Sequence, residues 1–261
     1  MRAPLYPGRL GMFRDWGCEI TYIDVDGRRV ALENGEAVFS VPLEWEPSPR
    51  VFGACSDEGC EPLVAEIAAV HYPQSFVAVD NKFVAPPASE KARILRDRVH
   101  IADAFAFGEL GAPNRLWEGE FDLPRPPVFT SMFGAERVIS DKTKPKAEPK
   151  RTRHQGLDFD GEIGDPIEAV QTGVVVLAEP LFYSGGTVFI NHGGGMFTTY
   201  FHMSEIKAHV GDHVRAGTLL GLVGKTGRVT GPHLHFSAKW RGTYFDPFEL
   251  FESFDQGPLT E

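Results

Sequence analysis

The sequence lacks the features of a membrane protein and of a disulfide scaffold. Its apolar runs fall well short of the roughly 20 residues that a membrane-spanning helix needs, and residues 1–13, MRAPLYPGRLGMF, hold no apolar stretch like that of a signal peptide. Three cysteines are too few to hold a chain of 261 residues together. We therefore expect no membrane span, and either a protein that stays inside the cell or one whose export signal has been removed.

The three cysteines themselves leave two interpretations open. Cys55 and Cys60, in the segment ACSDEGC, stand close enough to close a small disulfide ring, but reduced surface thiols fit the sequence about equally well. Cys18 follows no apolar run of the kind that accompanies a lipid anchor, so we expect a buried or idle thiol there.

Positive charge is scarce as well. The chain has 26 lysines and arginines against 36 aspartates and glutamates, a net charge of −10, whereas a general nucleic-acid-binding protein presents a basic face. We therefore expect no nucleic-acid partner. Six basic residues nevertheless gather in residues 141–153, DKTKPKAEPKRTR. This segment is expected to be a mobile solvated loop, with contact to an anionic polymer as the alternative.

Glycine and proline are abundant, and they separate short runs rich in Val, Phe and Thr. This composition favours strands and tight turns. Residues 13–84 read as short strands of a small antiparallel sandwich. Asp26-Gly27 and Asn34-Gly35 suit two-residue hairpin turns, and further strands are expected at residues 63–72 and 75–85.

One helix is predicted after Pro86-Pro87. Ser89 is the candidate N-cap and Gly108 the expected end, and we expect the helix to connect two β regions. The apolar residues at helical spacing are Ile94, Leu95, Val99, Ala102 and Phe105.

The carboxyl-terminal half holds histidines that an ordinary β core would not contain. His154 and Asp158 are four residues apart in a glycine-containing segment, and His202 lies inside an apolar strand. His233 and His235 flank one leucine, so on a strand both imidazoles point to the same face. Each feature alone has an ordinary structural explanation, and the histidine pair leaves a metal, a proton relay and chance all open.

Taken together, these residues favour a metal. Two imidazoles and one carboxylate, with water in the fourth position, make an open tetrahedral zinc site of the catalytic type. Magnesium or calcium would require more carboxylates. The remaining histidines are given no chemical role: His71, His100, His192, His209 and His213.

At these residues the sequence resembles the lysostaphin-type (LytM-type) zinc metalloendopeptidases, which cleave peptidoglycan peptides. The similarity runs through most of residues 128–250 and includes the segments SMFGAER, HQGLDFDG, GGTVFINHGGGMFTTYFHMS, VGDHVRAGTLLGLVGKTGRVTGPHLHF and FDPFEL. The resemblance implies one zinc ion per chain, with His154, Asp158 and His235 as ligands. It implies that His202 and His233 are the catalytic pair beside the metal, and which of the two is the general base stays open.

The resemblance also implies a mainly β fold in several parts. These are a small sandwich-like β domain (residues 1–85), a helical connector (86–127), a metallopeptidase domain (128–251) and a tail (252–261). The metallopeptidase domain is expected to form a two-layer antiparallel β-sheet groove related to lipoyl carriers. No lysine stands where a carrier presents its acyl group, which disfavours a carrier. The basic segment 141–153 is longer than the usual link in this family and is expected to line or cover the groove.

The function that the resemblance implies is hydrolysis of the cross-linking peptides of bacterial peptidoglycan, most simply a D,D-endopeptidase acting on D-Ala–diaminopimelate. The alternative is a catalytically silent member that binds the wall or activates an amidase. No glutamate lies beside the ligands to serve as base. Tyr200, two residues before His202, is the candidate for a further substrate or transition-state contact. We expect a monomer in the periplasm or outside the cell, with peptidoglycan stem peptides as its partners.

Overall fold

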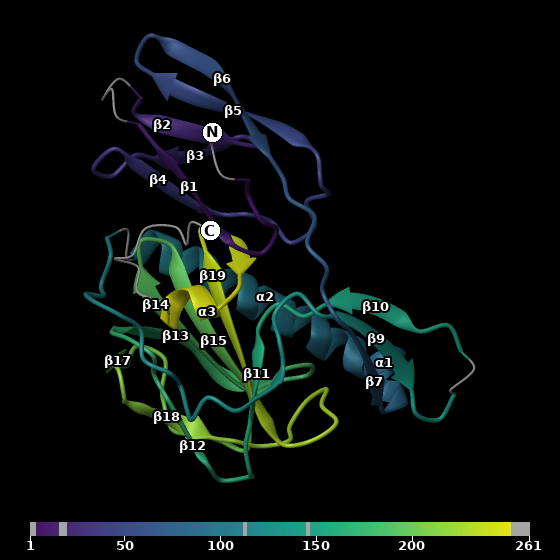
Figure 1. Cartoon of the computed structure of the whole chain (residues 1–261). Coiled ribbons are helices and arrows are strands. Elements are labelled where there is room, and N and C mark those ends of the chain that lie inside the picture. Colours follow the sequence, from purple (N-terminus) through teal and green to yellow (C-terminus); the bar gives the residue numbers. More distant parts are fainter. Residues whose placement is uncertain (1–3, 16–19, 112–113, 145–146, 252–261) are drawn as a thin grey trace.

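Strands dominate the structure, as the composition predicts (Figure 1). The structure is a computed structural model of the whole chain and describes residues 4–15, 20–111, 114–144 and 147–251, without the side chains of residues 107–111. Cys18 and the tail 252–261 lie outside the described residues. The predicted mainly β fold with antiparallel sheets is confirmed. None of the helices in the described residues is both long and apolar enough to cross a lipid bilayer.

The amino-terminal part, at the top of Figure 1, consists of small antiparallel sheets. One sheet has the order β3-β2-β5-β6, and β1 pairs separately with β4. These strands are β1 (Leu10–Arg14), β2 (Tyr22–Val25), β3 (Arg28–Ala31), β4 (Glu36–Ser40), β5 (Pro49–Ser56) and β6 (Gly59–Glu66). Their inward side chains, Ile23 and Phe52 among them, share one apolar core.

Both predicted hairpin turns of this part are confirmed. Asp26 and Gly27 have φ values of 51° and 81°, and Asn34 and Gly35 have 53° and 80°. A two-residue turn needs this left-handed backbone at both positions to match the twist of its strands, and Asn, Asp and Gly adopt it at low cost.

A disulfide bond joins Cys55 to Cys60. The two residues lie directly opposite each other on β5 and β6. The structure therefore decides between the two interpretations of ACSDEGC in favour of the small ring.

A second sheet, which we call the arm, projects beside the long helix at the right of Figure 1. It has the order β10-β9-β7, with β7 (Gln74–Val79) parallel to β9 (Glu136–Asp141) and β10 (Lys150–Arg153) antiparallel to it. The short helix α1 (Asn81–Val84) follows β7.

The arm corrects two expectations. Residues 75–85 are not one strand, because the chain leaves β7 and turns into α1. Residues 141–153 are not wholly a loop, because their last four residues form β10. β7 pairs with β9 more than 50 residues further along the chain, so local sequence does not reveal that pairing, whereas β10 pairs with β9 as the next strand in the sequence.

Helix α2 (Ala88–Gly111) covers one face of the main sheet rather than only connecting two regions. Ala104 and Phe105 pack there against apolar side chains of three strands of the main sheet. The predicted apolar face is partly wrong, since Leu95 and Val99 are exposed. Asp97 takes the inward position instead, because its carboxylate accepts a hydrogen bond from the backbone nitrogen of Phe182, in the turn between two of these strands.

The predicted end of α2 at Gly108 is also wrong, since the helix continues to Gly111. One glycine inside a helix costs only about 1 kcal/mol relative to alanine. The packing of the preceding turns against the sheet outweighs that cost.

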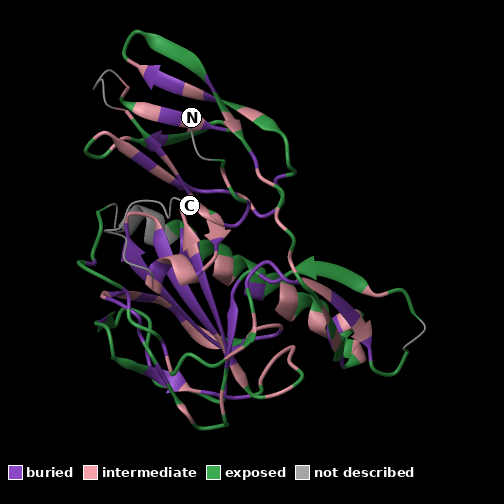
Figure 2. Ribbon diagram, viewed as in Figure 1, coloured by how far each residue is buried: buried purple, intermediate pink, exposed green. Residues whose placement is uncertain are grey.

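The main sheet has the strand order β17-β13-β14-β15-β19-β11-β8, with β20 paired to β19. Its strands are β8 (Phe129–Ser131), β11 (Leu157–Asp160), β13 (Gly173–Leu181), β14 (Gly185–Gly193), β15 (Met196–Met203), β17 (His213–Val214), β19 (His233–Trp240) and β20 (Thr243–Phe245). Most of this sheet is buried (Figure 2).

A smaller sheet packs against the main sheet as a second layer, as expected for a two-layer fold. Its order is β12 (Pro166–Glu168), β18 (Leu219–Leu222) and β16 (Glu205–Ile206), and the short helix α3 (Phe248–Phe251) closes the domain. The core between the layers includes Ile167, Leu220, Leu234 and Phe236. Leu234 points into this core, as the strand alternation around it predicts.

The amino-terminal part contacts this two-layer unit along β20 and α3. Arg9 pairs with Glu249 at 2.8 Å, and Arg28 donates to Thr243 Oγ1 at 2.9 Å. Leu43 joins the core of the two-layer unit. These contacts lie on the β20–α3 side of that unit.

Candidate active site

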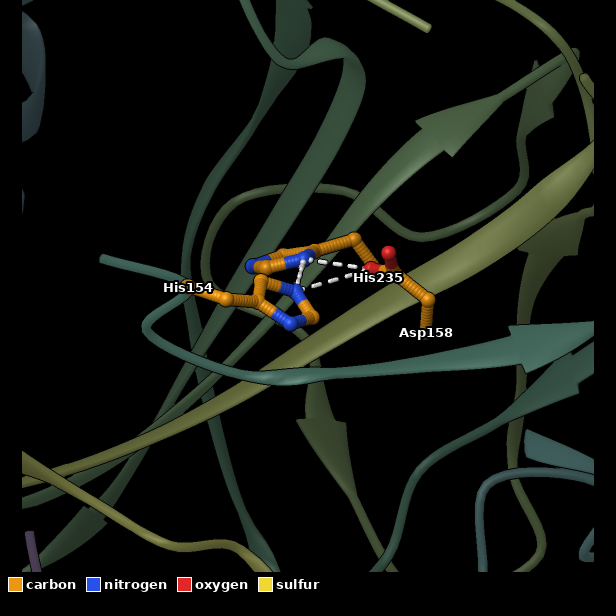
Figure 3. A group of neighbouring side chains, drawn as sticks. All are labelled: His154, Asp158 and His235. Carbon is orange, nitrogen blue, oxygen red and sulfur yellow. Dashed lines mark hydrogen bonds and ion pairs between the residues drawn. The ribbon is translucent and has the colours of Figure 1, made fainter. Parts of the chain in front are cut away.

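His154, Asp158 and His235 come together at one end of the main sheet (Figure 3). Asp158 on β11 and His235 on β19 are directly opposite in the antiparallel register, and His154 lies between β10 and β11. Asp158 Oδ1 is 3.0 Å from His154 Nε2 and 2.8 Å from His235 Nδ1, and the two nitrogens are 2.9 Å apart. All three residues are buried.

The hydrogen bonds around His154 determine what it presents to this cluster. Its Nδ1 is 2.8 Å from the carbonyl oxygen of Met132, which only accepts hydrogen bonds. Nδ1 therefore carries the proton, and Nε2 turns a lone pair toward the carboxylate of Asp158. Two acceptors 3.0 Å apart repel each other unless a cation lies between them. The donor set of two imidazoles and one carboxylate therefore fits a zinc ion.

The ionisation of the cluster suits a metal as well. Burial raises the pKa of Asp158, but the hydrogen bond with His235 and the surrounding polar contacts outweigh burial and hold that pKa well below its usual value. Burial lowers the pKa of His235 to about 4. The carboxylate is thus charged and the imidazole neutral at neutral pH, which are the forms that bind metals.

Arg137 on β9 is a residue of this site to which the sequence assigned no role. Its guanidinium pairs with Oδ2 of Asp158, the oxygen turned away from the histidines. Oδ1 is thereby left to face the imidazoles. The available signal was its place at the end of SMFGAER, a charged residue just before the buried Val138 and Ile139.

His202 and His233 lie beside this cluster, with ring centres 4.9 Å apart. His202 Nδ1 is 2.9 Å from the carbonyl oxygen of Thr226, and His233 Nδ1 is 3.0 Å from that of Gly231. Each Nδ1 therefore donates, and each Nε2 is left with a lone pair. Burial lowers the pKa of His202 well below its usual value, which keeps this imidazole neutral.

The backbone of His202 has the left-handed φ of 67°, which L residues rarely adopt. This conformation breaks the alternation of β15 at its end. Phe201 lies opposite His235 and stacks on it with ring centres 5.0 Å apart. The twist at His202 brings the next imidazole toward the same group, with ring centres 6.2 Å from His235.

The expected substrate contact of Tyr200 is wrong, because its side chain points into the core. Tyr200 is fully buried, and its hydroxyl accepts a hydrogen bond from the backbone nitrogen of Val170 at 3.2 Å and lies 3.1 Å from Thr198 Oγ1. The expectation assumed regular alternation up to His202, which the left-handed backbone at that residue breaks.

The histidines that were given no role lie outside the cluster among the described residues. His192 is fully buried, with Nδ1 2.7 Å from the carbonyl oxygen of Thr172 and Nε2 2.8 Å from Thr198 Oγ1. His100 contacts Glu179, and His209 lies on the surface near Asp212.

Comparison with known proteins identifies the domain that holds the site. Peptidase family M23 matches residues 152–247. The chain carries a peptidase family M23 domain. The matched residues of the M23 domain include all five of His154, Asp158, His202, His233 and His235. The expected resemblance to lysostaphin-type metallopeptidases is therefore confirmed.

Relatives of the M23 domain include proteins named as peptidases. The peptidoglycan DD-endopeptidase ShyA of Vibrio cholerae is 45% identical over 89 residues, which are 34% of this chain and 21% of ShyA. An uncharacterized metalloprotease of Buchnera aphidicola is 39% identical over 176 residues, 66% of this chain and 46% of that protein. The chain thus spans less than half the length of these relatives.

A solved structure resembles nearly the whole chain rather than the M23 domain alone. A putative peptidase M23 from Pseudomonas aeruginosa is 26% identical, with a TM-score of 0.68 and coverage of 94% of both chains. The likeness to this solved structure therefore extends beyond the M23 domain to the amino-terminal sheets, the arm and α2.

Proposed function

We propose that the protein is a zinc-dependent endopeptidase that hydrolyses the cross-linking peptides of bacterial peptidoglycan, with the D-Ala–diaminopimelate bond as its target. The observation that carries this proposal is the buried cluster in which His154 Nε2, Asp158 Oδ1 and His235 Nδ1 lie 2.8 to 3.0 Å from one another. The name of the related peptidoglycan DD-endopeptidase supports the substrate.

His154 Nε2, Asp158 Oδ1 and His235 Nδ1 are the atoms that would hold one zinc ion. Three protein ligands leave a fourth position for water or substrate, as in other catalytic zinc sites. A bound zinc ion supplies Lewis-acid chemistry, polarising a carbonyl and making water more acidic. Arg137 keeps the carboxylate of Asp158 oriented by holding its other oxygen.

His202 and His233 supply the proton transfers that hydrolysis needs. A water molecule adds to the peptide carbonyl and loses a proton to Nε2 of one of these histidines. The same nitrogen then returns the proton to the leaving amine as the carbon–nitrogen bond breaks. Both rings are held by backbone carbonyls through Nδ1, so Nε2 is the available atom in each. The neutral state of His202 suits it to accept a proton near neutral pH.

The location and form of the protein follow from this substrate. We propose that it works in the periplasm or outside the cell as a monomer, because peptidoglycan lies outside the cytoplasm. The bond between Cys55 and Cys60 supports an oxidising compartment. We also propose the division into an accessory domain (residues 1–85), a connector (86–127) and a catalytic domain (128–251).

The competing function is a silent family member that binds the wall or activates an amidase. Such a protein needs neither bound metal nor a proton-transfer pair, yet this chain has all five residues in one cluster. Digestion of purified cross-linked muropeptides by the zinc-loaded full chain tests the proposal, with product masses identifying the bond cut. Intact muropeptides, with the same result for His202→Ala, would contradict it.

A further inference from the structure

Arg228 lies in the loop that links the second layer to β19. Its backbone nitrogen donates to the carbonyl of Tyr183 at 2.8 Å, and its guanidinium lies 5.2 Å from the centre of the Tyr183 ring. Two residues earlier, the carbonyl of Thr226 holds Nδ1 of His202. Thr226 Oγ1 also ties this loop to the backbone of β14 and β15. The position of Arg228 is therefore fixed relative to His202.

The guanidinium of Arg228 has no anionic partner among the side chains that the structure describes. Two other partly buried arginines do have one: Arg137 pairs with Asp158, and Arg125 pairs with Asp165 at 3.0 Å. Burial lowers the pKa of Arg228, Tyr183 opposes that shift, and the positive charge of Arg137 adds to it. A partly buried cation next to another cation, without a counter-charge, attracts an anion.

The surroundings of Arg228 gather further positive charge in an acidic protein. A cleft of 760 Å³ lies against the same loop and is lined by Thr226, Gly227 and Val229 on either side of Arg228. The ionisable residues lining this cleft are Lys82, Arg93, Lys142 and Lys225 on the basic side and Asp80 and Glu90 on the acidic side. Asp80 pairs with Lys142 and Glu90 with Arg93, and Lys82 and Lys225 give the cleft beside this loop its excess of positive charge.

We propose that Arg228 binds a free carboxylate of the substrate next to the scissile bond, so that the site selects anionic peptides. This inference rests on the proposed peptidase function. In a D-Ala–diaminopimelate cross-link, the carbon that bears the scissile nitrogen also bears a free carboxylate, and a glycine bridge has none. A guanidinium binds a carboxylate through two parallel hydrogen bonds, which a lysine cannot reproduce.

Paired substrates test this role directly. One is a purified D-Ala–diaminopimelate cross-linked muropeptide, and the other is the same compound with that carboxylate converted to an amide. Binding of both is measured by calorimetry to the zinc-loaded full chain carrying His202→Ala, with and without Arg228→Gln. Cleavage of both is measured in the chain with an intact His202.

We expect the carboxylate form to bind about 10- to 100-fold more tightly than the amide, and Arg228→Gln to remove that difference. The loss should appear in KM more than in kcat, and Arg228→Lys should lose part of the preference. Arg215→Gln, at an exposed turn position between β17 and β18, is the matched control and should keep the preference.

Equal affinity of the chain that retains Arg228 for the carboxylate and the amide compound overturns the proposal. An equal loss of affinity for both compounds in Arg228→Gln overturns it as well. A preference in binding without cleavage by the chain with an intact His202 would instead overturn the proposed hydrolysis and leave the role of Arg228 standing. The two proposals therefore fail by different measurements.

Discussion

Two places in the main sheet bury histidines, and they do so in opposite ways. His192 on β14 has a complementary partner at each ring nitrogen, a carbonyl oxygen at Nδ1 and a threonine hydroxyl at Nε2. At the other place the lone pair of His154 faces the carboxylate of Asp158 and the ring of His235. Both places are buried, so burial alone does not separate them.

The difference lies in whether the polar atoms satisfy one another. A buried imidazole with a donor at one nitrogen and an acceptor at the other has both of its hydrogen bonds satisfied, so it needs no further partner. A cluster in which acceptors face acceptors needs a cation. We propose that complementarity of partners separates a structural histidine from a metal ligand in this fold, and the following predictions examine that distinction.

The largest effect is expected for His235→Ala. Removing one of three ligand atoms should lower zinc affinity by more than about 100-fold, the upper range for losing a residue that only orients a ligand. Hydrolysis should fall to the level of a protein-free sample. Metal analysis after dialysis and muropeptide digestion measure the two effects. His192→Gln is the matched control and should keep both zinc and activity, and a loss of zinc there would contradict the distinction.

His202→Ala should separate binding of the metal from proton transfer. We expect stoichiometric zinc to be retained, because Nε2 of His202 is not among the three clustered ligand atoms. Turnover should fall about 10²- to 10⁴-fold, the usual contribution of a general acid or base. Loss of zinc together with turnover would place His202 among the ligands instead.

The stability of the fold should depend on pH through His192. Burial lowers its pKa to about 4, against 6.5 for the unfolded chain. Its contribution is therefore fully present above pH 6.5 and is lost as the pH falls toward 4, because only the unfolded state takes up the proton. The expected loss is about 3 kcal/mol. Urea unfolding gives the free energy of unfolding of both proteins between pH 7 and pH 4. This free energy should fall by about 3 kcal/mol less in His192→Gln than in the unchanged protein. An equal fall in the two proteins would refute the assignment.

The smallest effect concerns the left-handed backbone at His202. His202→Gly should be more stable than His202→Ala by about 1 kcal/mol, because alanine must adopt a φ of 67° that glycine tolerates. Both variants lack the imidazole, so the difference isolates the backbone. Thermal unfolding of the pair measures it, and equal stabilities would mean that the strand relaxes when the imidazole is removed.

Sequence predicted the parts of the site that depend on regular strand geometry. The spacing of His233 and His235 predicts one shared face with Leu234 on the other, and the structure shows Leu234 in the core. The order of His154, Asp158, His202 and the histidine pair predicted that they meet, through resemblance to a family. The two-residue hairpins were predictable because Asp-Gly and Asn-Gly favour one backbone conformation.

The parts that sequence missed depend on contacts between distant segments or on a local break in regularity. Arg137 meets Asp158 only because β9 lies beside the site. Tyr200 was misplaced because no residue pattern marks the left-handed φ of His202. The inward face of α2 was misjudged because a buried Asp97 satisfies the backbone nitrogen of Phe182, which hydrophobic periodicity does not register.

The pairing of β11 with β19 also determines when during folding the site can exist. His154 and Asp158 are near neighbours, but 77 residues separate Asp158 from its cross-strand partner His235. Contacts of such long range form slowly, since a large loop must close first. An incompletely folded chain offers only the two local ligands and holds no complete site. The proteolytic activity proposed for this chain therefore requires the folded protein. We expect a nascent chain not to cleave the proteins or peptides around it.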